Sequence, residues 1–246
     1  MSHKGSGKIG NIKIKHYLCS PTIDKKAGCH TSLLPDRNMH IAIAGNIGSG
    51  KTTLTRMLAH HYGWTPKFET VAENPYLSDY YADIHRWAFN MEVFYLRQRF
   101  RDLLAISHCE DTVVQDRSIF EGVYVFTVNN HAMGNLDDRD FETYMELFEC
   151  MMSMVSMPDL MVYLQSPLTR LVDHIRQRGR SYEQKMPLEY LENLNRLYDD
   201  FIFHKYKGRK LVIKTDTLDF RDNPLDFKFI TDQIDACLTS QTTSCT

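Results

Sequence analysis

The segment that most restricts how this chain can fold is the sequence AGNIGSGKTT at residues 44–53. From Gly45 to Thr52 it matches the pattern G-x-x-x-x-G-K-[ST], which is typical of a loop that cradles the phosphates of a nucleotide. The apolar run HIAIA comes directly before the loop and LTRMLAHHY follows it, which supplies the strand and the helix that the motif requires. A glycine-rich turn with an incidental lysine is the alternative, and this flanking context disfavours it.

The residue types in this loop suit phosphate binding. Its glycines allow successive backbone N–H groups to approach phosphate oxygens without an intervening Cβ atom, and the N-terminus of the following helix adds the positive end of its dipole. Lys51 is expected to reach the β- and γ-phosphates, and Thr52 is expected to coordinate Mg²⁺. The predicted ATP site consists of Gly45, Asn46, Ile47, Gly48, Ser49, Gly50, Lys51, Thr52 and Thr53.

From Met39 onward, short apolar runs alternate with segments of helical apolar spacing. The apolar runs, which predict strands, are residues 40–44, 67–69, 112–115, 159–164 and 210–214. The predicted helices cover about residues 51–61, 83–106, 118–131, 139–156, 167–179, 187–206 and 224–238. This alternation favours a phosphate-loop fold in three layers, with a five-stranded parallel sheet between helices on both faces.

Charge is distributed unevenly along the 246 residues of the chain. Residues 1–38 carry seven Lys or Arg against two Asp or Glu, whereas residues 39–246 carry 22 against 29. An acidic globular part is not typical of a protein that coats nucleic acid, so no nucleic-acid partner is expected. Residues 1–38 lack sustained periodicity and are predicted to be a disordered basic extension, residues 39–239 one globular domain, and residues 240–246 a solvated tail.

Nothing in the sequence predicts a membrane-bound or secreted protein. No run approaches the roughly 18 apolar residues of a membrane span, and the N-terminus lacks the apolar core of a secretory signal. The six cysteines contain no CxxC pair, so reduced thiols are expected. We therefore expect a cytoplasmic protein without a membrane partner.

A second buried strand is predicted to end in the sequence TVVQD at residues 112–116. Asp116 stands where a phosphate loop needs a carboxylate for its metal ion. Arg117 follows it and places a cation where the charge of a transferred phosphoryl group collects. The alternative is that Asp116 is only the N-cap of the next helix.

More cations gather where the predicted helix at 167–179 ends. Arg176, Arg178 and Arg180 surround Gly179, which breaks the helix. This composition is typical of a lid that closes guanidinium groups over a triphosphate. The alternative is a solvated basic helix terminus, where cations are also favoured.

The long predicted helix at 83–106 carries a row of polar residues. Tyr81, Glu92 and Arg99 are separated by 11 and 7 residues, which corresponds to offsets of about 20°, so they share one face if the helix starts early enough. Apolar neighbours surround Glu92 and predict that it is buried, where an unpaired carboxylate is costly. The alternatives are an internal ion pair between Glu92 and Arg99, or simple exposure of Glu92.

Five segments, in order, resemble the deoxynucleoside kinase family of the bacterial deoxyadenosine and deoxyguanosine kinase type. They are GNIGSGKTT, FETVAENPYL, DYYADIHRWAFNMEVFYLRQRF, QDRSIFE and RQRGRSYEQKMPLEYL, and the likeness spans about residues 40–206. The chain has no Asn-Lys pair, so the guanine-reading N-K-x-D motif of switch GTPases is absent. The resemblance implies transfer of a phosphoryl group from ATP to the 5′-hydroxyl of a deoxynucleoside.

The resemblance also implies a role for particular residues. Glu69, in the family's Glu-Pro-Val position, would take the proton of the 5′-hydroxyl, although Thr70 replaces the proline, and Glu73 is the rival base. Arg117 would stabilise the transferring phosphoryl group. Glu69 and Arg117 would also contact the nucleoside. Tyr81 and Glu183 would bind its 3′-hydroxyl, and Glu92 and Arg99 would bind its base.

The type of residue at position 92 suggests which base is bound. Glu92 replaces the glutamine of many members, and a carboxylate offers only acceptors, which suits the two donors of guanine. We therefore predict a purine deoxynucleoside, with deoxyguanosine favoured over deoxyadenosine. Two positions depart from the family: Gly122 stands where base-reading members carry Asp, and His174 stands where some members have a lid arginine.

Two other functions are compatible with the motifs. One is a different small-molecule or nucleoside monophosphate kinase on the same fold, which would need further cations near the 83–106 helix for the acceptor phosphate. The other is a regulatory module that binds ATP without turnover. The Met-rich segment at 145–157 favours core packing or a helix-to-helix homodimer interface, and the resemblance also implies a homodimer.

Overall fold

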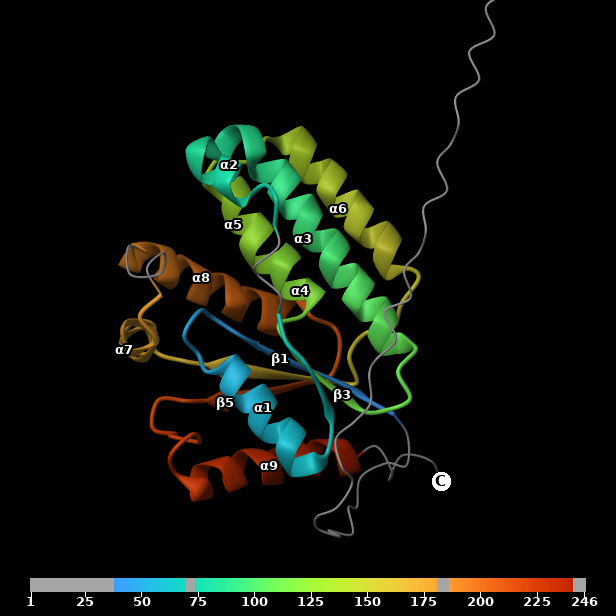
Figure 1. The fold of residues 1–246 in the computed structure, drawn as a ribbon, viewed down its shortest axis with the longest axis vertical. Helices are drawn as coiled ribbons and strands as arrows, with labels where there is room; N and C mark the ends of the chain where they lie inside the picture. The colour runs from blue at the N-terminus through green and yellow to red at the C-terminus, as the bar shows by residue number, and fades with distance from the viewer. Residues whose placement is uncertain (1–37, 70–73, 181–185, 241–246) are drawn as a thin grey trace, which may run out of the picture. The chain divides into compact units, whose positions relative to one another are not determined.

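The fold is built on a single parallel sheet (Figure 1). The computed structural model describes residues 38–69, 74–180 and 186–240. Five parallel strands are hydrogen-bonded in the order β2-β3-β1-β4-β5. They are β1 (His40–Gly45), β2 (Thr65–Lys67), β3 (Val113–Asp116), β4 (Leu160–Gln165) and β5 (Lys210–Lys214). The predicted three-layer fold with five parallel strands is therefore confirmed.

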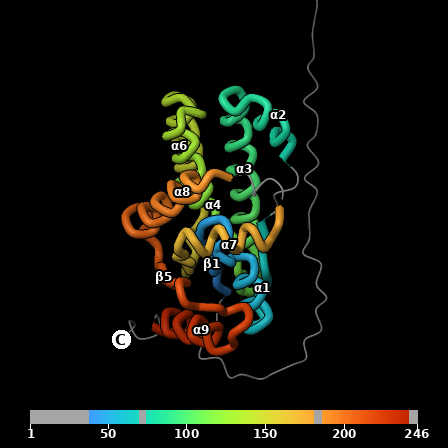
Figure 2. Tube along the Cα trace, turned by 90° about the vertical axis from the view of Figure 1, so that its left-hand side faces the viewer, coloured from blue at the N-terminus to red at the C-terminus, as the bar shows by residue number. Residues whose placement is uncertain are grey.

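Helices cover both faces of this sheet, as the two views in Figures 1 and 2 show. One face packs against α1 (Lys51–Tyr62) and α9 (Pro224–Thr239). Elements on the other face include α3 (Ile84–Ser107), α4 (Ile119–Glu121), the π-helical turn η1 (Gly122–Thr127), α5 (Val128–Ala132), α6 (Asp138–Met152), α8 (Leu188–Asp200) and the second π-helical turn η2 (Phe201–Lys205). Two further helices are α2 (Leu77–Ala82) and α7 (Leu168–Arg178).

Successive apolar side chains of the central strands point to opposite faces of the sheet, which explains why helices cover both faces. In β1, Ile41 and Ile43 pack into the cluster beneath α1 and α9, whereas Ala42 and Ala44 pack into the cluster on the opposite face. All six residues of β1 are buried. A strand that is apolar on both sides needs a helical layer on each side, which is the arrangement that the continuous apolar runs predict.

Three local expectations need correction. The second strand lies at 65–67 rather than 67–69, so Glu69 follows the strand instead of ending it. The predicted helix at 118–131 is divided into α4, η1 and α5. The polar row does not begin at Tyr81, because Tyr81 belongs to the separate helix α2. Asp83 causes this break: its backbone is extended, and its side chain accepts a hydrogen bond from the Arg86 N–H at 3.1 Å as the N-cap of α3.

Some expectations concern parts of the chain that the structure does not describe. Residues 1–37 and 241–246 lie outside the described residues, so the proposed extension and nearly all of the proposed tail stay predictions. None of the helices in the described part of the chain has the length and apolar character that crossing a membrane requires.

Gly48 offers a test of how the phosphate loop packs against α7. Its φ of +85° is left-handed, and an added Cβ would lie 2.8 Å from the Leu171 carbonyl oxygen. Gly63 is a matched control, because its φ is +70° but no described atom lies within 4 Å of an added Cβ. We expect Gly63→Ala to lower the free energy of unfolding by about 1 kcal/mol. Gly48→Ala should lower it by roughly a further 1–3 kcal/mol. Equal losses in urea unfolding would contradict the packing described.

Candidate active site

The carboxyl ends of three neighbouring strands bring the predicted site residues together. Strand pairing places Ile43 of β1 beside Asp116 of β3, and Lys67 of β2 beside Gln115 of β3. The segments that follow these strand ends carry the phosphate loop, Arg117 and Glu69. Ligands of open parallel sheets bind at this edge, where the order of the strands reverses.

The phosphate loop is fixed from the side of α8. The Asn46 side chain donates hydrogen bonds to the Leu191 carbonyl oxygen at 2.9 Å and to the Asn195 side-chain oxygen at 2.7 Å. The buried Lys51 ammonium donates to the Asn46 carbonyl oxygen at 3.0 Å. Burial, followed by the positive charge of Arg117, lowers the pKa of Lys51 to about 8. At this pKa Lys51 is still mostly charged at neutral pH, and a bound phosphate would stabilise the charged form further, which suits a lysine that binds an anionic ligand.

Glu121 anchors the start of the same loop, a role that sequence reasoning missed. Its fully buried carboxylate accepts hydrogen bonds from the Gly45 N–H at 3.3 Å, the Ser118 N–H at 2.7 Å and the Tyr198 hydroxyl at 3.0 Å. Burial raises the pKa of Glu121. The spacing Ser-x-x-Glu from Ser118 to Glu121 is a capping-box signature, and it was the available signal.

Thr52 and Asp116 form a pair of oxygen donors beside the phosphate loop. The Thr52 hydroxyl donates a hydrogen bond to one carboxylate oxygen of Asp116 at 2.5 Å. The other carboxylate oxygen, Oδ1, is buried and has no hydrogen-bond partner among the described residues. Asp116 is not the cap of the next helix, since Ser118 occupies that position, so this alternative is wrong. A buried carboxylate oxygen without a partner fits a ligand for Mg²⁺.

The described residues contain no group of three or more His, Cys, Asp or Glu side chains that could hold a metal ion. Mg²⁺ usually binds through one or two protein oxygens together with phosphate oxygens and water, and Thr52 and Asp116 would supply those protein oxygens.

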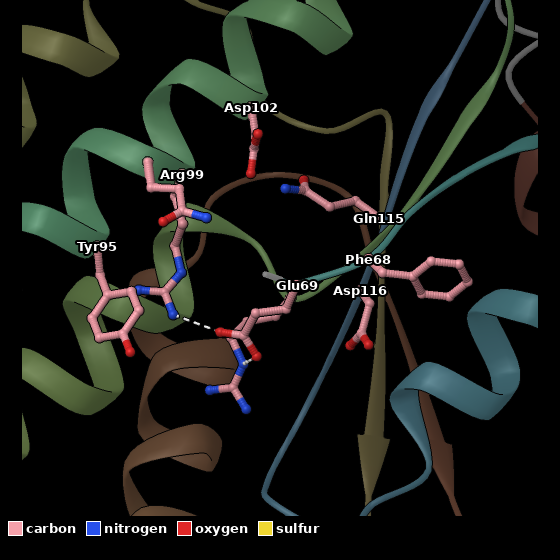
Figure 3. A pocket seen from close by; sticks show the side chains of 9 residues that line it. Phe68, Glu69, Tyr95, Arg99, Asp102, Gln115 and Asp116 are labelled. Carbon is pink, nitrogen blue, oxygen red and sulfur yellow. Dashed lines mark hydrogen bonds and ion pairs between the residues drawn. The ribbon is translucent and has the colours of Figure 1, made fainter. Parts of the chain in front are cut away.

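Glu69 is one of the residues that line a small pocket, and it lies between two arginines (Figure 3). Its Oε1 is 2.8 Å from Nη2 of Arg99, and its Oε2 is 3.0 Å from Nε of Arg117. Burial alone would raise the pKa of Glu69, but Arg117 and Arg99 outweigh burial and hold the pKa at about 2. The pocket is lined by Phe68, Glu69, Tyr95, Gln98, Arg99, Asp102, Gln115, Asp116 and Arg117.

Arg117 adopts an unusual backbone conformation to reach this position. Its φ of 67° makes it the one non-glycine among the described residues with a positive φ. Its guanidinium carbon lies 4.5 Å from the centroid of the Phe126 ring, which is a cation–π contact. Strained backbone of this kind persists where surrounding contacts hold it, and it is common at functional sites.

Glu92 is buried deep in the helical layer, as its apolar neighbours predict. Its side chain is 3% exposed, and it accepts hydrogen bonds from the Thr127 hydroxyl at 2.8 Å and the Asn130 amide at 2.6 Å. Burial raises the pKa of Glu92 in spite of these two bonds. The structure therefore excludes the exposed alternative, and it pairs Arg99 with Glu69 rather than with Glu92.

The remaining residues predicted for the nucleoside and for ATP lie on α2, at the end of α7 or outside the described residues. Tyr81 is 65% exposed, and its ring lies 5.6 Å from that of Tyr80, which donates to the Asn130 side chain at 3.3 Å. Arg176, Arg178 and Arg180 are exposed at the end of α7. The predicted residues Glu183 and Glu73, and the departure at Thr70, lie outside the described residues.

The two departures from the family have visible consequences. An added Cβ at Gly122 would lie 2.6 Å from Nη1 of Arg99, so a side chain there would displace this guanidinium. Nδ1 of His174 lies 2.7 Å from the Gly48 carbonyl oxygen. A carbonyl oxygen only accepts, so Nδ1 carries the proton and His174 ties α7 to the phosphate loop.

Comparison with known proteins decides the family. The model of the deoxynucleoside kinase family matches residues 41–239. The chain belongs to the deoxynucleoside kinase family. The kinase is 32% identical to a deoxyadenosine/deoxycytidine kinase of Bacillus subtilis, over 80% of this chain and 92% of that protein. It is 34% identical to a deoxyguanosine kinase of Lactobacillus acidophilus, over 79% of this chain and 88% of that protein.

Solved structures agree with this assignment. A deoxyadenosine kinase from M. mycoides with bound dATP matches with a TM-score of 0.68 and 28% identity, over 80% of this chain and 99% of that one. The same kinase with bound dCTP matches with a TM-score of 0.68 and 26% identity, over 80% of this chain and 100% of that one. This chain is therefore an enzyme of the phosphotransferase type.

Glu121 provides a test of the anchored loop in this kinase. The Gly45 and Ser118 N–H groups donate to different oxygens of the Glu121 carboxylate, and Glu121→Gln replaces one of these oxygens by an NH₂ group, which cannot accept. One buried backbone N–H is then left unpaired, so we expect the free energy of unfolding to fall by about 1–3 kcal/mol. Tyr198→Phe is the matched variant, because it removes one donor and leaves no backbone group unpaired, and it should cost about 1 kcal/mol. A Glu121→Gln protein as stable as wild type in urea unfolding would mean that Glu121 is already protonated.

Proposed function

We propose that this kinase transfers the γ-phosphoryl group of ATP to the 5′-hydroxyl of a purine deoxynucleoside, giving the monophosphate in nucleotide salvage. The observation that carries the proposal is the convergence of Glu69, Lys51 and the Thr52–Asp116 pair at the carboxyl ends of β1, β2 and β3. A carboxylate that faces a phosphate loop supplies what transfer to an alcohol needs, which is an acceptor for the hydroxyl proton.

Different charged residues have different roles in the proposed phosphoryl transfer. Lys51, Arg117 and the arginines at the end of α7 neutralise the phosphoryl charge, which is the main requirement of a loose transition state. Thr52 and Asp116 would hold Mg²⁺, which when bound neutralises charge on the β- and γ-phosphates. Glu69 is ionised at neutral pH and orients the 5′-hydroxyl, but a pKa of about 2 makes it a weak base.

The base of the nucleoside is proposed to lie between Glu92 and Arg99. Each carboxylate oxygen has two lone pairs. Glu92 can therefore accept hydrogen bonds from guanine N1–H and the 2-amino group while it keeps its hydrogen bonds from Thr127 and Asn130. Arg99 would then face O6 of guanine. Tyr81 and Glu183 would hold the 3′-hydroxyl. These contacts favour deoxyguanosine, followed by deoxyadenosine.

The assembly and location of the protein are part of the same proposal. In the segment at 145–157, Met145, Met151 and Met152 pack against the core, whereas Met154 is 61% and Met157 39% exposed. Exposed methionines just beyond the end of α6 suit a protein–protein interface in this region. We propose a cytoplasmic homodimer that contacts its partner through this helical layer.

The direct test is phosphorylation of the four natural deoxynucleosides with ATP and Mg²⁺, followed by chromatography of the products. We expect deoxyguanosine to have the highest kcat/KM and the monophosphates to be poor acceptors. Glu69→Gln should bind ATP normally but lower kcat by about 10²-fold or more, because the acceptor for the hydroxyl proton is lost. Phosphorylation of monophosphates alone, or near-normal turnover by Glu69→Gln, would reject this function or this role of Glu69.

The choice of base should depend on pH. Because burial raises the pKa of Glu92, protonation on acidification begins at a higher pH than for an ordinary glutamate. Protonated Glu92 offers one donor and one acceptor, like an amide, which suits adenine. As the pH is lowered, the ratio of kcat/KM for deoxyguanosine over deoxyadenosine should fall at a higher pH than an ordinary glutamate would give, by roughly 5-fold or more once Glu92 is protonated.

Glu92→Gln is the control for this pH effect. It cannot ionise, so its ratio should be low and independent of pH. A ratio that does not fall in Glu92→Gln would exclude reading of the base by Glu92.

A further inference from the structure

Arg99 connects the two halves of the proposed acceptor site. Its guanidinium contacts Glu69 at 2.8 Å, and its charge also acts on Glu92, seven residues earlier on α3. The guanidinium carbon lies 5.2 Å from the centroid of the Tyr95 ring, and the absent side chain of Gly122 makes room for Nη1. One cation therefore stands between the group that would read the base and the group that would accept the hydroxyl proton.

The contact between Arg99 and Glu69 makes Glu69 a weaker proton acceptor for phosphoryl transfer. Each oxygen of the Glu69 carboxylate is engaged by an arginine, Oε1 by Arg99 and Oε2 by Arg117. Cations at this distance stabilise the ionised carboxylate and weaken it as a proton acceptor. Arg117 follows β3 and is fixed by its backbone and by Phe126, whereas Arg99 reaches Glu69 from a helix through a long side chain. Arg99 is thus the cation that a bound nucleoside can draw away.

A kinase that binds ATP without an acceptor faces a competing reaction, which is hydrolysis. The oxygen of a water molecule forms a bond to the γ-phosphorus, the bond from the γ-phosphorus to the bridging oxygen breaks, and ADP leaves with the electron pair. The water proton passes to Glu69 or to solvent. A weaker Glu69 slows this reaction in the same way as it slows transfer to an alcohol.

We propose that the Arg99–Glu69 ion pair restrains Glu69 until a nucleobase binds, and so suppresses transfer of the phosphoryl group to water. A hydrogen-bond acceptor of the base, such as O6 of guanine or a ring nitrogen of adenine, then attracts Arg99, and Glu69 becomes free to accept the proton of the 5′-hydroxyl. The inference rests on the proposed function, because it assumes that the base lies at Glu92 and Arg99. It makes Arg99 a positioning residue that acts through Glu69, in addition to any contact that it makes with the base.

The test is formation of ADP from Mg²⁺ and ATP in the absence of nucleoside. Arg99→Met should raise this rate by at least ~5-fold, because one of the two cations at Glu69 is lost. Arg97→Met is the matched control: Arg97 is exposed two residues earlier on α3, stacked on Phe94, and its loss should leave the rate unchanged. In Arg99→Met with Glu69→Gln, the rate should return to the wild-type value or below it.

Two further measurements separate this role from simple binding of the base. With 1,2-dideoxyribofuranose, an acceptor that keeps the furanose ring and its 5-hydroxyl but has no base, Arg99→Met should act faster than wild type, although its kcat/KM for deoxynucleosides falls. The acid limb of the hydrolysis rate should move to higher pH in Arg99→Met, since Glu69 then faces Arg117 and Lys51 but not Arg99. A residue that only bound the base would change neither.

Hydrolysis by Arg99→Met at or below the wild-type rate, with ATP affinity intact, would overturn the inference. If Arg99→Met does not fold, Arg99→Gln replaces it with the same expected outcome. Arg99→Lys keeps the charge on a shorter side chain, and its hydrolysis rate should lie between those of wild type and Arg99→Met. Wild-type protein that phosphorylates no deoxynucleoside would reject the proposed function itself, whereas normal phosphorylation without increased hydrolysis would reject only the restraint by Arg99.

Discussion

Mutual neutralisation of buried charges is the constraint on which the rest of this site depends. Lys51 and Arg117 share the carboxyl ends of three strands with Asp116, Glu69 and Glu121, and all except Glu69 are less than a tenth exposed. An isolated charge at such depth costs several kcal/mol, so each of these groups is tolerable only because its partners are present. Parallel strand pairing supplies those partners, since it brings segments far apart in the sequence to one edge of the sheet.

The sequence could predict those parts of the site that depend on residues close together along the chain. The phosphate loop follows from eight consecutive residues and their flanks, and Asp116 follows from the end of an apolar run. Burial of Glu92 follows from the apolar residues around it. In each case the residues that form the pattern lie within a few positions of the residue whose structure they predict. The prediction therefore does not depend on contacts with distant parts of the chain.

The partners of these residues were not predictable in the same way. Glu92 is satisfied by Thr127 and Asn130, which reach it from a helical region that contains a π turn. A π turn shifts every later side chain relative to the 3.6-residue period, so a pattern of that period gives the wrong face. The pair of Glu69 with Arg99 joins residues 30 apart in the sequence, and nothing in local spacing indicates that these two side chains meet.

The left-handed backbone of Arg117 is strained, and the contacts of Arg117 with its neighbours offset this strain. A φ of 67° costs a non-glycine residue about 1–3 kcal/mol, so contacts elsewhere must offset it. The Arg117 N–H donates to the Ile43 carbonyl oxygen at 3.1 Å, which continues the pairing of β3 with β1 beyond the end of the strand. The guanidinium then has an aromatic ring and a carboxylate as partners.

A relaxed backbone at Arg117 would turn this guanidinium away from Glu69 and leave Arg99 as the only arginine paired with that carboxylate among the described residues. The strain therefore keeps one cation permanently at the point where phosphoryl charge would collect. Arg99, on an unstrained helix, is left as the cation that can respond to an acceptor. Under the proposed restraint, a fixed arginine and a movable one act on the same carboxylate, so that one small pocket combines strong charge neutralisation with dependence on the bound nucleoside.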